Sequence, residues 1–179
     1  MTDNPNLSQF LDRLEKLNDE TRTEAKNKRY KLGLRTAREN LDHLVDDQSF
    51  LEYGAFAVAA QRNRRKYEDL QIDTAADGII TGFCKINSDL IGEEKSYAVS
   101  IVYDYSVLAG TQGFFHHMKL DRICKKAKEF KLPIVIYTEG GGGRPGDTDV
   151  ATSVAGLHFP SFAPWARLFG RCLRIDKNN

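Results

Sequence analysis

Short β-branched apolar runs in the middle of the chain predict three strands. Residues 79–86 and 96–102 are two such runs, and the polar, glycine-containing connection between them suggests a hairpin. Residues 132–136 form a third run, which is short, apolar and bounded by turn residues. We therefore expect a buried strand directly before the glycine-rich stretch that follows Tyr137.

Helical periodicity appears on both sides of the hairpin. Residues 8–30 are expected to form one helix, with Ser8 at its start and leucines at positions 11, 14 and 17. Thr36 and Glu39 are spaced for a capping box, which predicts a shorter helix over residues 36–45. A further helix is expected from about His116, because one face of it carries Leu120, Ile123, Cys124, Ala127 and Phe130.

The order of these elements predicts an α/β fold. A brief strand is expected in residues 49–54, followed by the hairpin, a glycine-containing turn at 104–113, the helix, the buried strand and the glycine-rich stretch. Strand, turn, helix, strand is the βαβ arrangement of a mainly parallel sheet, in which ligands gather at the carboxyl ends of the strands. Both glycine segments follow strands, so they could line one site. A partly apolar helix is expected after Val150, with breaks at Pro160 and Pro164.

The four consecutive glycines at 140–143 are the strongest candidate for chemistry. Glycine loses more backbone entropy on folding than any other residue, so a run of it needs a reason. Backbone N–H groups freed of Cβ atoms could converge on an anion or an oxyanion, while the alternative is a flexible surface loop. The Gly-Lys-Ser/Thr ending of a P-loop is missing, and a dinucleotide fingerprint over residues 141–146 is interrupted by Pro145.

Other candidate groups have competing interpretations. Glu139 and Asp147 flank the glycines and could be a carboxylate pair, although acids beside a turn more often hydrogen-bond to it. The basic residues between Lys26 and Arg35 could contact phosphates or simply end a solvated helix. His116 and His117 are adjacent in the expected helix and cannot share one face, which argues against a metal site.

Composition narrows the class of protein. The 179 residues suit one domain, and 41% hydrophobic with 28% charged residues is ordinary for a soluble globular chain. A net charge of +1 gives no overall attraction to nucleic acid. Three widely spaced cysteines, a polar N-terminus and no long apolar run predict a cytoplasmic protein with reduced thiols and no membrane segment.

Four motifs in this order resemble the carboxyltransferase subunits of biotin-dependent acyl-CoA carboxylases. They lie at residues 36–52, 76–82, 104–119 and 139–144, and they include Thr36-Ala37-Arg38-Glu39-Asn40-Leu41, Ala76-Asp77-Gly78, Asp104-Tyr105-Ser106 and Glu139-Gly140-Gly141-Gly142-Gly143-Arg144. The Arg-Pro-Gly-Asp-Thr-Asp segment after the glycines looks closest to the branch with long-chain and single-chain enzymes. Most of the family has serine and alanine at the positions of Gly140 and Gly143, which bears on substrate preference.

The resemblance implies a crotonase-like fold of ββα units and transfer of a carboxyl group from carboxybiotin to an acyl-CoA. It implies that the amides of Gly141, Gly142 and Gly143 form an oxyanion hole and that Gly110 and Thr111 border the thioester. It also assigns Lys119, Arg29, Arg35 and Arg144 to substrate binding, with the first three near CoA phosphates. Biotin would be carried by a partner, and no metal is implied.

The resemblance covers only the first, CoA-binding half of the family's domain. It implies a helical segment at 1–35, a partial carboxyltransferase domain at 36–170 and an unassigned tail at 171–179. Expected partners are biotin carboxyl carrier and biotin carboxylase components, a second carboxyltransferase half or a second copy of the chain. Two other functions stay open, namely a different crotonase-like reaction such as hydration, isomerisation or decarboxylation, and a non-catalytic assembly module.

Overall fold

A computed structural model describes residues 4–140, 142–144 and 146–149. Two helices, α1 (Pro5–Glu15) and α2 (Thr23–Lys31), precede α3 (Ala37–Leu44), the short strand β1 (Leu51–Glu52) and α4 (Tyr67–Asp73). The hairpin strands β2 (Ile79–Lys85) and β3 (Tyr97–Tyr103) enclose the short helices α5 (Ser88–Ile91) and α6 (Glu93–Ser96). Helix α7 (Phe114–Phe130) and strand β4 (Ile134–Tyr137) follow.

The described strands form one sheet with the order β1-β2-β3-β4. β1 and β3 both pair antiparallel with β2, and β3 pairs parallel with β4. The predicted hairpin and the β3-α7-β4 crossover are therefore confirmed. The expectation of a mainly parallel sheet is wrong for the described strands, because the antiparallel pairings outnumber the parallel one.

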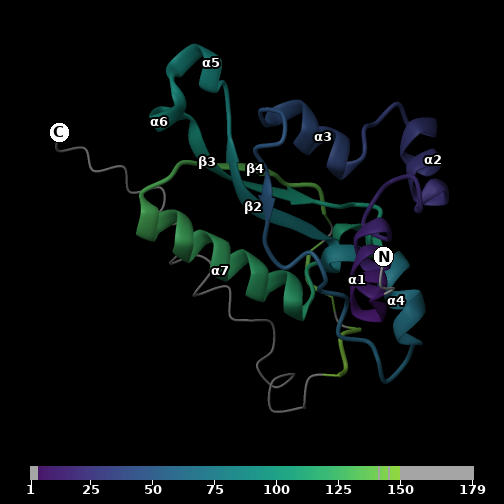
Figure 1. Ribbon diagram of the computed structural model, residues 1–179. Helices are drawn as coiled ribbons and strands as arrows, with labels where there is room; N and C mark the ends of the chain where they lie inside the picture. Colours follow the sequence, from purple (N-terminus) through teal and green to yellow (C-terminus); the bar gives the residue numbers. More distant parts are fainter. Residues whose placement is uncertain (1–3, 141, 145, 150–179) are drawn as a thin grey trace.

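Helices cover both faces of this sheet (Figure 1). Helix α7 lies on one face, where buried residues of its apolar stripe, such as Leu120 and Ile123, join Val99 and Ile101 in the main core. Helix α3 lies on the other face, where Leu41 packs with Ile80 and Val102. The carboxyl ends of β3 and β4 lie at one edge of the sheet, next to the start of α7.

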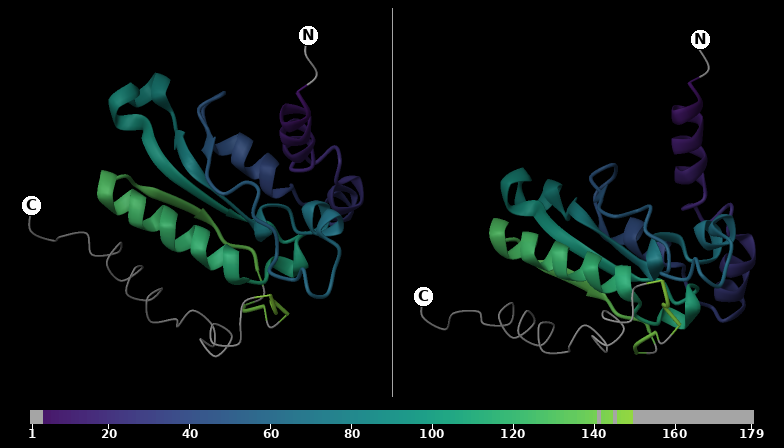
Figure 2. Two further views of the ribbon diagram at one scale, coloured as in Figure 1. Left: turned by 60° about the horizontal axis from the view of Figure 1, so that its bottom comes forward. Right: turned by 90° about the horizontal axis from the view of Figure 1, so that it is seen from below.

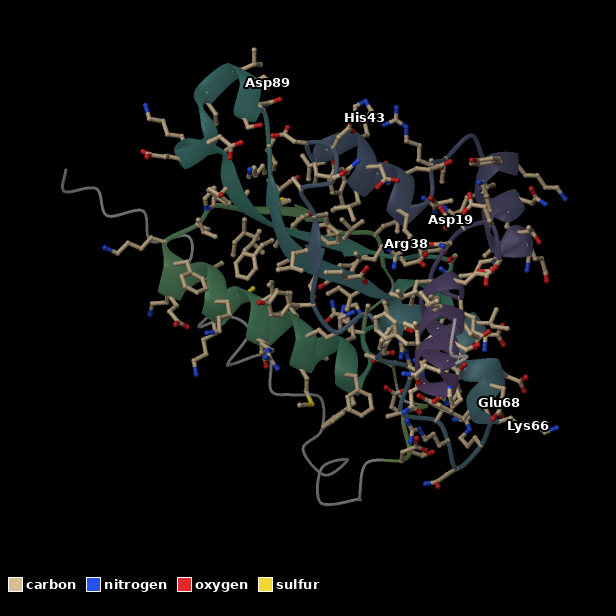
Figure 3. The ribbon with its side chains drawn as sticks, in the orientation of Figure 1. Asp19, Arg38, His43, Lys66, Glu68 and Asp89 are labelled. Carbon is tan, nitrogen blue, oxygen red and sulfur yellow. The ribbon has the colours of Figure 1, made fainter. Side chains whose placement is uncertain are left out.

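The single helix expected over residues 8–30 is instead two helices. The chain turns between Glu15 and Thr23, and the Thr21 hydroxyl donates to the carbonyl oxygens of Glu15 and Asn18. Leu17 is buried in this turn, and its carbonyl accepts a hydrogen bond of 2.7 Å from Arg38 Nε. A tertiary contact thus overrides the leucine periodicity. Figure 3 shows Asp19 and Arg38 where α3 meets this turn.

The capping box predicted at the start of α3 is confirmed. The Thr36 side chain accepts from the Glu39 N–H, and the Glu39 carboxylate accepts from the Thr36 N–H. The Thr36 hydroxyl also donates to Asp19, which ties α3 to the N-terminal turn.

Helix α1 extends away from the body of the molecule (Figure 2). No helix in the described part of the chain is long and apolar enough to span a membrane.

Candidate functional site

The two glycine segments lie against each other at the edge of the sheet. A Cβ atom added to Gly110 would be 2.2 Å from the Glu139 carbonyl oxygen, and one added to Gly140 would be 2.2 Å from the Gly110 carbonyl oxygen. Neither position could hold a larger residue without moving the backbone. The N–H of Gln112 donates to the Gly142 carbonyl at 2.7 Å, and the Arg144 N–H donates back to the Gln112 carbonyl at 2.8 Å. The sequence thus correctly placed both segments at one edge.

The tip of the second segment faces open space. Gly142 has φ of +87°, a conformation that L-residues rarely adopt, and no atom lies within 4 Å of a Cβ built there. Gly142 and Gly143 are both exposed, and within the described residues no acceptor takes the N–H of either. Two of the three predicted oxyanion donors are therefore open to a ligand. Gly141, the third, lies outside the described residues.

Arg144 does not face the open side of the loop. Its side chain is only 4% exposed, and the guanidinium donates to the Asp77 carboxylate and to the Thr111 carbonyl at 2.7 Å. Nε also lies 3.3 Å from the Thr111 hydroxyl, and Nη1 lies 3.6 Å from the Asp147 carboxylate. The geometry does not support the expected direct contact between Arg144 and substrate, because Nε, Nη1 and Nη2 of its guanidinium all donate to groups inside the protein.

Asp77 sits in a turn with an uncommon backbone. Ala76, Asp77 and Gly78 have φ of 55°, 52° and 72°, and Asp77 is 0% exposed. Its carboxylate accepts from the N–H of His116 at 2.7 Å as well as from Arg144. Burial raises the pKa of Asp77, while the adjacent Arg144 acts in the opposite direction. The buried turn therefore joins the start of α7 to the glycine loop, residues 139–147.

Lys119 is buried and bonded to backbone carbonyls inside the protein. It is 8% exposed, and its ammonium donates to the carbonyls of Ile79 and, at 2.8 Å, of Ala76. Burial lowers the pKa of Lys119 to about 8. The interpretation of Lys119 as a CoA contact is not supported, because the ammonium group stabilises the carbonyl oxygens of the buried turn instead.

His116 and His117 are both buried at the start of α7. His116 Nδ1 lies 3.3 Å from the Asp77 carbonyl, and its ring meets the Tyr103 ring edge-on with centroids 4.7 Å apart. Burial, and secondarily His117, lowers the pKa of His116 to about 3, so its imidazole is neutral. Across residues 4–140, 142–144 and 146–149, no three His, Cys, Asp or Glu side chains gather as a metal ion would require.

An open groove of about 600 Å³ lies between α2, α4 and residues 105–109. Leu32, Ile72, Leu108 and Ala109 give it apolar walls. Four cations, Arg22, Lys28, Arg29 and Arg65, also line it together with the acids Glu24 and Asp73, and each cation is paired with a carboxylate. Leu108 and Ala109 directly precede Gly110, so the groove reaches the glycine segments along the chain. A ligand with an anionic end, an apolar middle and a carbonyl group would fit this sequence of surfaces.

Arg29 connects the groove to the glycine loop. Its guanidinium forms a two-pronged ion pair with Glu139, with N–O distances of 2.7 and 2.8 Å, and Nε donates to the Arg35 carbonyl at 3.0 Å. Arg29 is thus a buried link between elements, whereas the side chain expected beside it, Arg35, is exposed and lines a separate pocket of about 450 Å³.

The two acids that flank the glycines are both engaged in structural bonds. Glu139 pairs with Arg29, while Asp147 accepts from the Phe114 N–H at 2.8 Å and from Gln61 at 3.1 Å. Asp147 thus bonds to the backbone at the start of α7, whereas Glu139 pairs with a side chain of α2 and not with the glycine turn.

Sequence reasoning missed two buried charges near the groove. Arg22 pairs with Asp104 at 2.8 Å, and both side chains are at most 10% exposed. Asp104 also accepts from the Ser106 N–H and hydroxyl, which fixes the turn after β3. The Asp-x-Ser spacing is a local signal for such a turn, but nothing in the sequence places Arg22 beside it.

Comparison with known proteins identifies the family. Residues 28–159 match the model of the carboxyl transferase domain. The chain is 33% identical over 124 residues to the propionyl-CoA carboxylase β chain of Cereibacter sphaeroides, covering 69% of this chain and 22% of that one. It is 30% identical over 117 residues to the methylmalonyl-CoA decarboxylase subunit alpha of Veillonella parvula, covering 65% of this chain and 21% of the relative.

A solved structure is similar over most of the chain. It is that of a single-chain, multi-domain long-chain acyl-CoA carboxylase, which is 48% identical with a TM-score of 0.81 and covers 93% of this chain and 16% of the larger one. The similarity agrees with the branch that the residues after the glycines indicated. The chain spans about a fifth of the length of the curated relatives named above. It belongs to the carboxyl transferase domain family.

Proposed function

We propose that this chain is the acyl-CoA-binding part of a biotin-dependent acyl-CoA carboxyltransferase with a crotonase-like fold of ββα units. The observation that carries the proposal is the exposed pair of glycine amides, at 142 and 143, in a loop that packs against Gly110 and Gln112, the segment that follows the groove wall at Leu108 and Ala109. Family membership supports the reaction class, and the groove supports a CoA thioester as the ligand. The proposed domain spans residues 36–170, with 1–35 as a helical segment and 171–179 outside it.

The chemistry assigned to this chain is stabilisation of negative charge. Loss of a proton from the α-carbon of a thioester places charge on its carbonyl oxygen. Fixed backbone donors stabilise such an oxyanion without reorganising, by roughly 3 kcal/mol each. We assign this role to the amides of Gly142 and Gly143, with Gly141 as a further candidate, and place Gly110 and Thr111 beside the thioester. Carboxybiotin, carried on a partner, would supply the carboxyl group.

The groove is the proposed site of the CoA moiety. Lys28 is the most exposed of its cations, with a side chain that is 72% exposed, and Arg65 lies across from it on the α4 side. These two side chains are more exposed than Arg29 or Lys119, and each pairs with a single exposed carboxylate, Lys28 with Glu24 and Arg65 with Asp73, so they are better placed to meet phosphates. Leu32 and Ile72 would contact the apolar portion of the pantetheine arm.

Decarboxylation of a malonyl-type thioester is the alternative that a specific observation favours. One relative bears the name of a methylmalonyl-CoA decarboxylase subunit, and that reaction forms the same enolate in the reverse direction. Hydration is less well supported, because Glu139 and Asp147 are both engaged in structural bonds. A non-catalytic assembly module would keep the fold but would not need open amides at the loop.

Titration calorimetry with acetyl-CoA, propionyl-CoA and a long-chain acyl-CoA tests the proposal. We expect binding that Gly142→Val weakens, because a side chain at φ of +87° strains the backbone and projects into the open space. Gly92→Val is the matched control, since Gly92 has φ of +85° with nothing within 4 Å and lies in the distant connection between α5 and α6. Equal weakening by both variants, or no binding by the wild type, would count against the site.

A multi-subunit assembly is part of the proposal. Leu7, Leu11 and Leu14 form one stripe along α1, and they are 54%, 53% and 38% exposed. Such a stripe is better suited to a partner than to water. Biotin carboxyl carrier, biotin carboxylase, a second carboxyltransferase half and a second copy of this chain are the expected components. Light scattering that shows a monomer at all concentrations would argue against self-association.

A further inference from the structure

We infer that Arg144 is a positioning residue, whose buried guanidinium sets the geometry of the glycine loop from behind. The inference deepens the proposed function and rests on it for its catalytic meaning. Arg144 follows the exposed glycines directly, so any displacement of its backbone moves the amides of Gly142 and Gly143. We use the name Arg144 cluster for Arg144, Asp77, Thr111 and Asp147.

The cluster joins separate parts of the chain through one side chain. The guanidinium of Arg144 bonds to Asp77 in the buried turn and to the backbone carbonyl of Thr111 in the first glycine segment. Asp147 lies 3.6 Å from the same guanidinium and accepts from the Phe114 N–H at the start of α7. Arg144 and Asp147 thereby attach the glycine loop to the buried turn, the first glycine segment and the start of α7.

Backbone bonds reinforce the same alignment. The Gln112 N–H donates to Gly142 and the Arg144 N–H donates to Gln112, so Gln112 and Gly143 form a parallel β-bridge. The side chain of Arg144 and its own backbone therefore both hold the loop against residues 111–112. A loop held in this way presents its amides in one orientation, which is what a fixed oxyanion site needs.

The surrounding sequence makes room for this arginine. A Cβ atom on Gly113 would be 2.3 Å from Arg144 Nη1 and 2.4 Å from Asp147 Oδ2. A Cβ on Gly78, where φ is +72°, would be 3.6 Å from Nη2. The absence of a side chain at Gly113 is thus a requirement of the Arg144 cluster.

Lysine cannot reproduce these contacts. The planar guanidinium reaches a carboxylate and a carbonyl in different directions at once, whereas an ammonium is a single point on a flexible stem. Arg144→Lys therefore keeps the buried charge opposite Asp77 and loses the contact with Thr111. Arg64→Lys is the matched control, because Arg64 also bonds to this loop, at the Gly146 carbonyl, but is exposed.

Hydrogen exchange of individual amides tests the positioning role without any ligand. In Arg144→Lys we expect the backbone amides of Gln112 and of position 144 to exchange at least about tenfold faster, as local opening becomes easier. The amides of the β2–β3 ladder should keep their wild-type rates, and Arg64→Lys should leave every rate unchanged. Gly113→Ala displaces the guanidinium by an independent route and should accelerate the same amides.

Two exchange results would overturn the inference. One is an unchanged rate at Gln112 in both Arg144→Lys and Gly113→Ala. The other is equal acceleration of the β2–β3 amides, which would mean that Arg144 supports the whole fold and not the loop in particular.

A binding comparison then tests the catalytic meaning. The probes are CoA and its 2-nitroethyl thioether, whose nitronate form mimics the charge of a thioester enolate. Wild-type protein should bind the nitronate at least about 100-fold more tightly than CoA, as expected of an analogue of the charged state. Arg144→Lys should reduce this preference about tenfold through misplaced donors, while the Kd for CoA stays unchanged.

The outcomes separate the two proposals. A wild type without preference for the nitronate would refute the oxyanion role in the proposed function, and the exchange rates would still decide whether Arg144 positions the loop. A wild type with the preference and an Arg144→Lys variant that retains it in full would refute the inference alone.

Discussion

Replacement of His116 by phenylalanine should change how the stability of the protein depends on pH. His116 is 0% exposed, and within the described residues its Nε2 atom has no hydrogen-bond partner. Its surroundings are the Asp77 carbonyl, the Tyr103 ring, His117, Lys119 and Arg144. A proton added to this ring in the folded state would be buried beside other cations.

The direction of the effect follows from the two pKa values. Folding lowers the pKa of His116 from 6.5 to about 3, so between these values the unfolded chain binds the proton and the folded protein does not. Stability is therefore lost as the pH falls through 6.5 toward 3. Each pH unit in this window costs about 1.4 kcal/mol, which amounts to about 2 kcal/mol between pH 6.5 and 5.

His116→Phe removes this pH-dependent loss and keeps the ring packed on Tyr103. At pH 7.5 the variant should be less stable by about 1 kcal/mol, because the contact between Nδ1 and the Asp77 carbonyl is gone. At pH 5 the order should reverse, since the wild type has lost about 2 kcal/mol that the variant keeps.

Urea unfolding followed by circular dichroism at pH 7.5, 6 and 5 measures both free energies. His43→Phe is the control, because His43 is exposed at the end of α3 (Figure 3) and should leave the pH dependence of the wild type unchanged. Parallel pH curves for the wild type and His116→Phe would refute the reasoning, as they would show that His116 takes up a proton equally in both states.

Three further sets of substitutions have defined outcomes. Arg29→Glu and Glu139→Arg should each lower the free energy of unfolding by about 2 kcal/mol, which is less than for a fully buried pair because the Glu139 side chain is 39% exposed. In urea unfolding, the double variant should recover more than half of this loss, and no recovery would contradict a direct ion pair. Thr36→Ala should lose about 1 kcal/mol with the capping box in the same assay, and restoration of the hydroxyl by Thr36→Ser should reverse it. Leu70→Ala, at a site that is 0% exposed, should lower the free energy of unfolding by about 2–5 kcal/mol. Leu90→Ala, at a site that is 81% exposed, should lower it by less than about 0.5 kcal/mol, and similar losses for both variants would contradict the burial argument.

Local signals in the sequence predicted much of the fold. The hairpin, the helix after the first glycine segment and the strand before the second were identified because each has its own periodicity and its own turn residues. The capping box at Thr36 was identified because both partners lie within four residues of chain. These features depend on short-range chemistry, which a sequence displays directly.

The errors came from contacts between distant residues. Leu11, Leu14 and Leu17 continue one helical period, but Leu17 lies in the turn after α1, where it is buried and its carbonyl accepts a hydrogen bond from Arg38. The internal contacts of Lys119 and Arg144 were not foreseen for the same reason, since a basic residue looks alike in sequence whether its side chain meets solvent or a buried carbonyl. Only the folded structure shows which groups the ammonium of Lys119 and the guanidinium of Arg144 contact.

The burial of Arg144 makes its ion pair with Asp77 insensitive to ionic strength. At 0.15 M salt, exposed charges more than about 8 Å apart are largely screened, and the open groove with Lys28 is subject to this screening. The pair between Arg144 and Asp77, with side chains 4% and 0% exposed, is shielded from mobile ions. Salt should therefore weaken the capture of an anionic ligand in the groove and leave the Arg144–Asp77 contact behind the glycine amides intact. Ligand capture and amide alignment thus depend on different charges in this protein.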